Sequence, residues 1–355
     1  MTMWLLGIAA LFVCYFLSIN TKNPRKIFFI SAGILLVLIW GSRYFINDFT
    51  DEITYNYLYT GYTNRSFSSL VEEYLGERDF GFYLVYWCMA NVIPWSQFPI
   101  YFITAAFIAV TFRFIYKNTD GTLIPALLMF SFGTFSFYMA AYRQCFAMCI
   151  CLCAFECAKK RGLRGLIPYA LLMTAAVFMH ISAIIFIPVY FILRIKYSGG
   201  GNVVWLLAAI GVMAAASAIM TFASEWLEED GLLDRMEFST TGLVIQMLIM
   251  AVPIVIYVLS LSSYGRLAGV QHVILILTSI GMLFLAFKFM YYTYERVSYY
   301  YSFFVIGAFS NAITGLKESK SGLRYKAPLL VAVVLLLVAL AYIRMPTDTR
   351  FFWQA

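Results

Sequence analysis

Residues 141–164 read AYRQCFAMCICLCAFECAKKRGLR, an apolar run that carries an arginine near its start and a basic cluster at its end. About 15 apolar residues separate Arg143 from Lys159, and as an α-helix they would cover about 20 to 25 Å. Short connectors rich in lysine and arginine stay on the cytoplasmic side of a bilayer. The stretch therefore predicts a membrane helix whose Lys159 end is cytoplasmic and whose Arg143 end lies near the outer face.

Apolar runs of this kind recur along the whole chain of 355 residues, which is 63% hydrophobic and 12% charged with a mean hydropathy of +0.82. Most runs are about 17 to 22 residues long, enough to cross a bilayer, and none shows the alternation of a barrel strand. We expect an all-α, polytopic integral membrane protein, residues 1–355 forming one transmembrane domain of about 10 to 13 membrane helices or half-helices. Spans are predicted near residues 3–19, 27–45, 98–116, 122–139, 141–158, 203–223, 243–262, 270–291, 301–316 and 327–343.

The net charge of +7 hides a segregation of the two signs. Basic residues sit in the short connectors, whereas 13 of the 18 acidic residues fall in two hydrophilic segments, seven in 46–79 and six in 224–242. We predict that both segments are outer loops. The basic balance thus indicates orientation in a lipid bilayer and gives no support to nucleic acid as a partner.

Two stretches do not fit simple counting. Residues 166–193 are almost continuously apolar yet have basic connectors on both sides, which predicts two half-length arms that turn near His180; the alternative is one long tilted helix. Residues 80–96 would place the basic connector on the wrong side if they spanned, so we predict an interfacial or re-entrant element.

Cationic side chains inside apolar runs are candidates for function, because a charge near the bilayer centre costs about 2.5 to 3.5 kcal/mol on insertion scales. Arg143 and Arg296 are predicted at the same outer level, where paired guanidinium groups suit phosphate, and Lys288 lies close to Arg296 in the chain. His180 reaches that level if the two arms form. The alternatives are an arginine that only anchors a helix end and a hydrogen-bonded core histidine.

Carboxylates are supplied by the first predicted outer loop. Asp48, Asp51 and Glu52 follow the second predicted span, and Glu77 and Asp79 precede the next apolar run. A carboxylate at the membrane surface can act as a general base on a hydroxyl while arginines neutralise a departing phosphate. The alternative is a solvated acidic loop.

Cysteines offer no metal site by their spacing. Cys145, Cys149, Cys153 and Cys157 recur every fourth residue within one apolar helix, which favours close helix packing over a metal site or a disulfide framework. Glycine-rich phosphate loops and zinc-protease motifs are also absent from the sequence. We expect neither a metal nor another cofactor.

Six short elements occur in a recognisable order: NDFTDEITYNY, RDFGFYLVY, YRQCFAM, a basic loop, AVFMHISA and ERVSYYY. This order, over roughly residues 30 to 305, resembles the EpsG family, Wzy-like bacterial polysaccharide polymerases. The acids of the first outer loop are also similar to the pattern of GT-C glycosyltransferases, whose catalytic acid lies there. Either Asp48 or Asp51 matches the family's first acid, and the Thr50–Asp51 order favours Asp51.

The resemblance implies a GT-C-like fold in the bacterial cytoplasmic membrane and glycosyl transfer between undecaprenyl-diphosphate-linked oligosaccharides without a metal. A flippase and a chain-length regulator are the implied protein partners. The resemblance assigns catalysis to four residues: Asp51, Arg143, His180 and Arg296. It assigns substrate binding to eight others: Asp48, Glu52, Tyr55, Asp79, Gln144, Ser182, Lys288 and Tyr300.

Two other classes of protein would use similar residues. An O-antigen ligase or another GT-C transferase with a lipid-linked donor needs the same cations and carboxylates. A transporter of lipid-linked oligosaccharides would instead gather its polar groups near the midplane between structural repeats. The predicted depth at one face and the lack of a repeat favour the polymerase over the transporter. The ligase or other transferase fits the same residues, so that alternative stays open.

Overall fold

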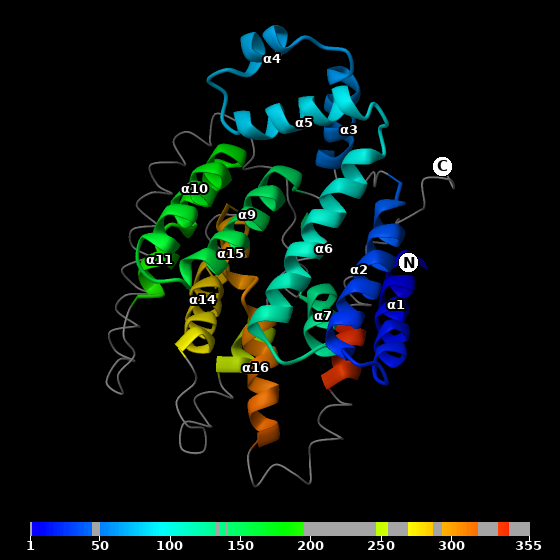
Figure 1. The fold of residues 1–355 in the computed structure, drawn as a ribbon, viewed down its shortest axis with the longest axis vertical. Helices are drawn as coiled ribbons and strands as arrows, with labels where there is room; N and C mark the ends of the chain where they lie inside the picture. The colour runs from blue at the N-terminus through cyan, green and yellow to red at the C-terminus, as the bar shows by residue number, and fades with distance from the viewer. Residues whose placement is uncertain are drawn as a thin grey trace. The chain divides into compact units, whose positions relative to one another are not determined.

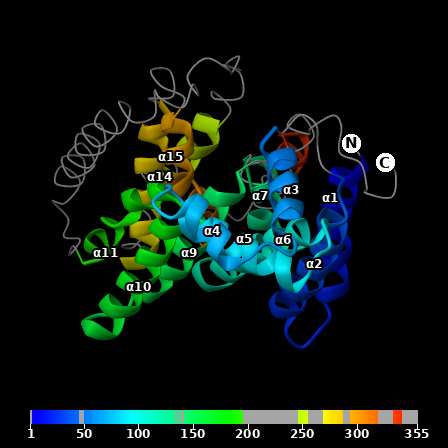
Figure 2. The same ribbon diagram turned by 90° about the horizontal axis from the view of Figure 1, so that it is seen from above.

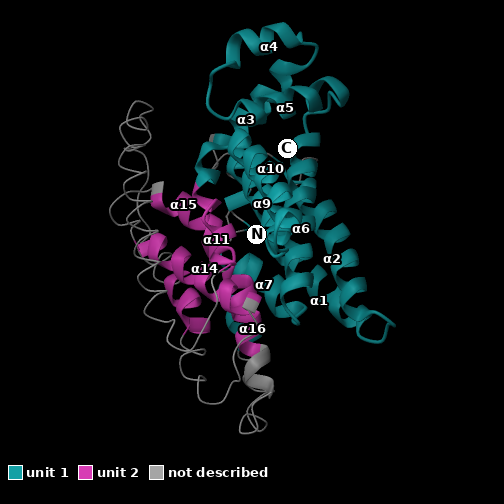
Figure 3. Ribbon diagram, turned by 60° about the vertical axis from the view of Figure 1, so that its left-hand side comes forward, with its two compact units in different colours: residues 1–184, 323–355 teal, residues 185–322 magenta. Residues whose placement is uncertain are grey.

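The computed structural model describes residues 2–44, 50–132, 135, 137–138, 141–194, 246–254, 269–286, 293–318 and 333–340. The elements of this part are helices, as the sequence predicts, and Figure 1 shows their arrangement along the chain. The chain divides into two compact units, Met1–Ile184 with Leu323–Ala355 and Ile185–Gly322, which Figure 3 colours separately. The single transmembrane domain stays a prediction, since each unit is described by itself.

The first unit is built on α1 (Thr2–Ser18), α2 (Pro24–Gly41), α6 (Phe98–Asn118), α7 (Leu123–Ser131), α9 (Tyr142–Ala158) and α10 (Leu163–Met179). Helix α2 starts with Pro24 at its first position, where the missing N–H costs nothing. Near its end the Trp40 ring lies 5.1 Å from Trp4 and 4.7 Å from Phe135. These buried aromatic contacts fix the end of α2, directly before Arg43.

The outward surface of α2 is apolar. Ile27, Ile30, Ile34 and Leu38 recur at helical spacing and are all exposed. A soluble monomer rarely leaves such a stripe in water, because burying it would be favourable. Among the described residues α2 and α6 are the helices long and apolar enough to cross a membrane. The stripe on α2 is the surface expected to face lipid.

A cap of three helices covers one end of α6, α9 and α10 (Figures 1 and 2). It consists of α3 (Thr50–Tyr62), α4 (Phe67–Tyr74) and α5 (Phe80–Val92), with α5 lying across the ends of the longer helices. At 1.5 Å per residue α5 is only about 20 Å long, short of the roughly 30 Å of a bilayer core. Its length and direction fit the predicted interfacial or re-entrant element.

Helices α9 and α10 form a hairpin around the basic connector. Gly162 adopts a left-handed φ of 68° in this turn. Beside it Glu156 pairs with Lys159 at 2.7 Å and accepts a 2.8 Å bond from Asn118 of α6. Glu156 is therefore half of a local ion pair at the end of α9.

Helix α10 ends at Met179, and His180 continues in extended backbone with φ −161° and ψ 120°. The 3-10 helix η1 (Ile181–Phe186) follows directly, and α11 (Val189–Ile192) comes after it. The break near His180 is thus confirmed, and the alternative of one continuous helix is not formed. The direction of the second arm beyond Ile184 belongs to the other unit and stays a prediction.

The second unit contains α11, α14 (Gly269–Ala286), α15 (Thr293–Ser302) and α16 (Val305–Glu318). A Cβ on Gly281 would lie 2.7 Å from the Cα of Ser302, so this glycine permits α14 and α15 to touch through their backbones. The predicted span at 301–316 differs in detail, because α15 ends at Ser302 before α16 begins. The predicted span at 203–223 lies outside the described residues.

Candidate functional site

The first turn of α9 brings together motifs that are far apart in the sequence. Asp79 immediately precedes α5, His180 immediately follows α10, and Arg143 is the second residue of α9. All three belong to the first unit. The structure brings Arg143 and His180 into contact with an acid of the first predicted outer loop, and this acid is Asp79 and not Asp51.

The Asp79 carboxylate, just before α5, contacts both the first turn of α9 and the residues that follow α10. Asp79 Oδ2 lies 2.9 Å from His180 Nδ1 and 3.2 Å from Arg143 Nη1, and Oδ1 accepts a 3.1 Å bond from the backbone N–H of Ile181. Both oxygens are therefore engaged, by a cation, an imidazole and a backbone donor. We call Asp79, Arg143 and His180 the carboxylate triad.

The environment of Asp79 keeps its carboxylate ionised. Burial alone would raise its pKa, but the hydrogen bond and charge of His180, the charge of Arg143 and the Ile181 N–H together lower the pKa below its usual value. The group is therefore negatively charged near neutral pH. A negative Asp79 favours the tautomer in which His180 Nδ1 carries a proton and Nε2 is free to accept one.

The backbone conformation around Asp79 brings its side chain to Arg143 and His180. Asp79 itself has a left-handed φ of 66°, unusual for a residue other than glycine. Two residues on, a Cβ on Gly81 would lie only 2.6 Å from the carbonyl oxygen of Phe178. The RDFGF motif thus needs its glycine because α5 crosses the end of α10 in direct backbone contact.

Arg143 and His180 are the accessible members of the triad. Their side chains are 38% and 20% exposed, compared with 4% for Asp79. Arg143 Nη1 is also 3.5 Å from the hydroxyl of Tyr83, and its guanidinium interacts with Tyr55. The arginine therefore keeps part of its guanidinium exposed while three neighbours, Asp79, Tyr83 and Tyr55, define its position.

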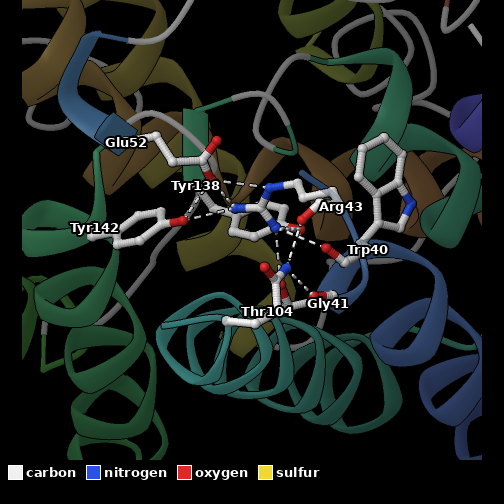
Figure 4. A network of polar contacts seen from close by, with 8 residues as sticks. Trp40, Gly41, Arg43, Glu52, Thr104, Tyr138 and Tyr142 are labelled. Atoms are coloured by element: carbon white, nitrogen blue, oxygen red, sulfur yellow. Dashed lines mark hydrogen bonds and ion pairs between the residues drawn. The ribbon is translucent and has the colours of Figure 1, made fainter. Parts of the chain in front are cut away.

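A second polar cluster contains Tyr142, the residue directly before Arg143 in α9, and is shown in Figure 4. Arg43 Nη2 and Glu52 Oε1 are 2.6 Å apart with no exposed surface on either side chain. The hydroxyl of Tyr142 lies 2.5 Å from Glu52 Oε1 and 3.0 Å from Arg43 Nη2. Arg43 Nη1 also donates to the Trp40 carbonyl at 2.9 Å and to Thr104 at 3.2 Å. We call Arg43, Glu52 and Tyr142 the buried cluster.

The other predicted site residues have different positions. Asp51 is half-buried in the first turn of α3, one turn before the buried Tyr55, whose ring stacks on Tyr142 at 4.7 Å. Glu52, predicted to bind substrate, is directed into the buried cluster. Gln144 is buried within α9, and Ser182 is half-buried in η1.

The remaining predicted residues cannot be placed against the triad. Arg296 is half-buried and Tyr300 is buried in α15 of the second unit. Their approach to Arg143 stays a prediction. Asp48 and Lys288 lie outside the described residues.

Three residues of these clusters were missed by the sequence reasoning: Arg43, Tyr83 and Tyr142. Arg43 could have been found, because it is an ionisable residue inside a predicted span, which is the rule that selected Arg143. Its partner is nine residues away across a connector, a separation that no helical spacing rule detects. Tyr83 and Tyr142 stand beside selected residues, but an aromatic near a membrane surface gives no signal of its own.

The cysteines are consistent with the packing interpretation. Cys145, Cys149 and Cys151 are buried in α9, and Cys153 and Cys157 are partly exposed, all as free thiols. Within the described ranges no cluster of three or more histidine, cysteine or acidic side chains could hold a metal ion.

The fold and site define a helical membrane protein with an ionised carboxylate, an imidazole and a guanidinium at one end of its helices. A sequence profile of the EpsG family, a family of Wzy-like polysaccharide polymerases, matches residues 7–353, nearly the entire chain. The chain belongs to the EpsG family, as its motif order indicates. No curated protein and no solved structure matches it.

Proposed function

We propose that this protein is a polysaccharide polymerase of the bacterial cytoplasmic membrane, which it crosses several times. It joins undecaprenyl-diphosphate-linked oligosaccharide repeat units at the outer face by glycosyl transfer. The growing chain on one lipid diphosphate is the donor, and a sugar hydroxyl of a repeat unit on another is the acceptor. The glycosyl diphosphate bond is already activated, so no nucleotide is needed.

The observation that carries the proposal is the meeting of Asp79, Arg143 and His180. A transfer from a lipid diphosphate asks for a base near the attacking hydroxyl and for cations near the departing diphosphate. The buried Asp79 carboxylate contacts one group of each kind, the imidazole of His180 and the guanidinium of Arg143. Both of these side chains are accessible and are oriented by this carboxylate.

His180 is the base that this geometry favours. Asp79 orients the ring through Nδ1, and Nε2 has no hydrogen-bond partner in the described part of the chain. Nε2 takes the proton of the acceptor hydroxyl, and the hydroxyl oxygen forms a bond to the anomeric carbon of the donor. The bond from that carbon to the diphosphate oxygen breaks, its electron pair leaves with undecaprenyl diphosphate, and the proton passes later to solvent.

Arg143 stabilises the leaving diphosphate in this mechanism. Its guanidinium is half-exposed and retains donors beyond those on Asp79 and Tyr83. Arg296 and Lys288 are proposed as further cations for the same group. Asp51 is the second candidate for the base, because its first-turn position in α3 places it near Tyr55.

The direct test is to purify the protein in nanodiscs with a lipid-linked repeat unit and to follow the products on a gel. A ladder of longer products without added nucleotide or metal is expected. Transfer of one unit to lipid A would indicate an O-antigen ligase. Movement of the lipid across the membrane without bond formation would indicate a transporter.

The site is tested by Arg143→Ala, Arg296→Ala and His180→Ala. Each is expected to abolish the ladder while leaving a folded protein and single repeat units displayed on the cell. Arg65→Ala is the matched control, because Arg65 pairs with Glu73 on the exposed part of the cap. Normal polymer length in all three variants would reject this mechanism.

A further inference from the structure

The first turn of α9 lacks an ordinary helix cap. Its N-cap residue is Ala141, which makes no side-chain hydrogen bond to the helix. An uncapped helix end leaves its first N–H groups without partners and tends to fray. Side chains of the first turn must therefore supply the order that Arg143 needs.

The buried cluster supplies such an anchor at Tyr142. The tyrosine hydroxyl reaches both Glu52 Oε1 and Arg43 Nη2, at 2.5 Å and 3.0 Å. Its ring stacks on Tyr55 at 4.7 Å with an interplanar angle of 9°. A rigid phenol held at both its ring and its hydroxyl fixes the rotation of α9 about its axis.

The cluster itself cannot bind a ligand in this state. Arg43 Nε donates to Glu52 at 3.1 Å, Nη1 donates to the Trp40 carbonyl, and Nη2 donates to Glu52 and Tyr142. Neither Arg43 nor Glu52 has exposed surface. A buried, fully engaged ion pair acts through the groups that it holds.

Tyr142 and Arg143 are consecutive, so their side chains leave the helix about 100° apart. Tyr142 bonds to Arg43, just after α2, and to Glu52 in the first turn of α3. Arg143 instead pairs with Asp79, just before α5. Movement of Tyr142 would therefore turn Arg143 away from the Asp79 carboxylate.

We propose that Arg43, Glu52 and Tyr142 are positioning residues that set the guanidinium of Arg143 for a lipid-linked diphosphate. This inference rests on the proposed function for the identity of that ligand. It assigns Glu52 to positioning instead of direct substrate contact. Arg43 and Tyr142 gain roles that the motif order did not give them.

The test uses Tyr142→Phe, which removes the hydroxyl and keeps the stacked ring. Full-length protein in nanodiscs is titrated with undecaprenyl diphosphate, and its melting temperature is recorded in parallel. The variant is expected to bind about fivefold more weakly, the usual net worth of one hydrogen bond, and to polymerise about tenfold or more slowly because Arg143 is misplaced. Tyr59→Phe is the matched control, since Tyr59 is also buried and donates one bond, to the Ile93 carbonyl at 2.7 Å, away from α9.

Coupling to Arg143 separates positioning from general stability. In an Arg143→Ala background, where no ladder is expected, Tyr142→Phe is expected not to weaken the binding of undecaprenyl diphosphate any further. Equal losses in both backgrounds, or no loss in the single variant, would overturn the inference. Arg43→Lys, which keeps a positive charge opposite Glu52 but loses the planar donor fork, provides a second variant with the same expectation if Tyr142→Phe folds poorly.

The two proposals fail in different ways. Wild-type protein that binds undecaprenyl diphosphate with the expected coupling, yet forms no ladder, would reject the polymerase and retain the positioning role. A ladder without the coupling would reject the positioning role alone. Wild-type protein that does not bind undecaprenyl diphosphate would overturn both.

Discussion

The buried cluster and the carboxylate triad pair an arginine with a carboxylate at the same end of α9, but their surroundings differ. Arg43 and Glu52 have no exposed surface and their polar atoms are engaged within the protein, whereas Arg143 is 38% exposed and faces outward with part of its donor fork. The same two chemical groups can therefore serve different purposes. Exposure and unused donors, and not the ion pair itself, distinguish a ligand-binding pair from one that fixes the structure.

The largest effect on stability is expected from Glu52→Ala. It leaves Arg43 charged and unpaired in the protein interior, which costs about 3 to 5 kcal/mol. Thermal unfolding in detergent measures the loss. The control is Glu73→Ala at the exposed Arg65–Glu73 pair, where a change below about 1 kcal/mol is expected. Similar losses in the two variants would show that burial does not distinguish these pairs.

Asp79→Asn tests the triad by activity. The amide keeps the shape of the side chain but no longer provides a negative charge to orient His180 and Arg143. Loss of an oriented base typically lowers a rate by about 100- to 10,000-fold, and gel ladders with the lipid-linked repeat unit measure it. Asp51→Asn is the informative comparison. If Asp51→Asn alone stops the reaction, Asp51 is the base and His180 is not.

The sequence predicted Arg143 and His180 as site residues because each is a polar residue in or beside an apolar run, and helix length placed Arg143 near the outer face. Asp79 was predicted as a carboxylate of the first outer loop. It did not predict which acid pairs with His180. That choice depends on the left-handed turn at Asp79 and on the contact of Gly81 with Phe178, which bring two segments about 100 residues apart into contact. Helical periodicity carries no information on such a crossing.

The helices themselves were largely predictable, since hydropathy places α1, α2, α6, α9 and α10 within a few residues of their observed bounds. The buried cluster was not. Arg43 lies in a connector whose path between α2 and α3 decides whether it meets Glu52 or water. That path is set by tertiary contacts, including the bonds from Gln97 to the carbonyls of Gly41 and Arg43 at 2.9 Å and 2.6 Å.

Gly81→Ala tests the backbone contact between α5 and α10 that brings Asp79 to the triad. The added methyl group meets the Phe178 carbonyl, so α5 must shift, at a cost of about 1 to 3 kcal/mol. Polymer formation should also fall, because Asp79 moves away from His180. Gly61→Ala in α3 is the control, since nothing lies within 4 Å of a Cβ there. Activity equal to that of the control would exclude the backbone contact as a determinant of the site.

The smallest effect concerns pH. The folded-state pKa of Asp79 is lowered, so its contribution to stability is fully present above its unfolded pKa of about 3.9 and is lost as the pH falls through the folded value. The difference in melting temperature between wild type and Asp79→Asn should be largest near pH 7 and should shrink below about pH 4. A difference that grows on acidification would contradict the ionised assignment.

The length of α9 links the triad to membrane thickness. Arg143 and the Glu156–Lys159 pair lie near opposite ends of one helix, and the 16 residue steps from Arg143 to Lys159 correspond to about 24 Å, less than the roughly 30 Å of a typical hydrocarbon core. With Lys159 held at one headgroup layer, Arg143 would lie slightly inside the opposite one. Lipids with longer acyl chains should move it deeper through hydrophobic mismatch, and shorter ones should bring it level with a lipid diphosphate. The choice of reconstitution lipid therefore becomes a physical variable of the site.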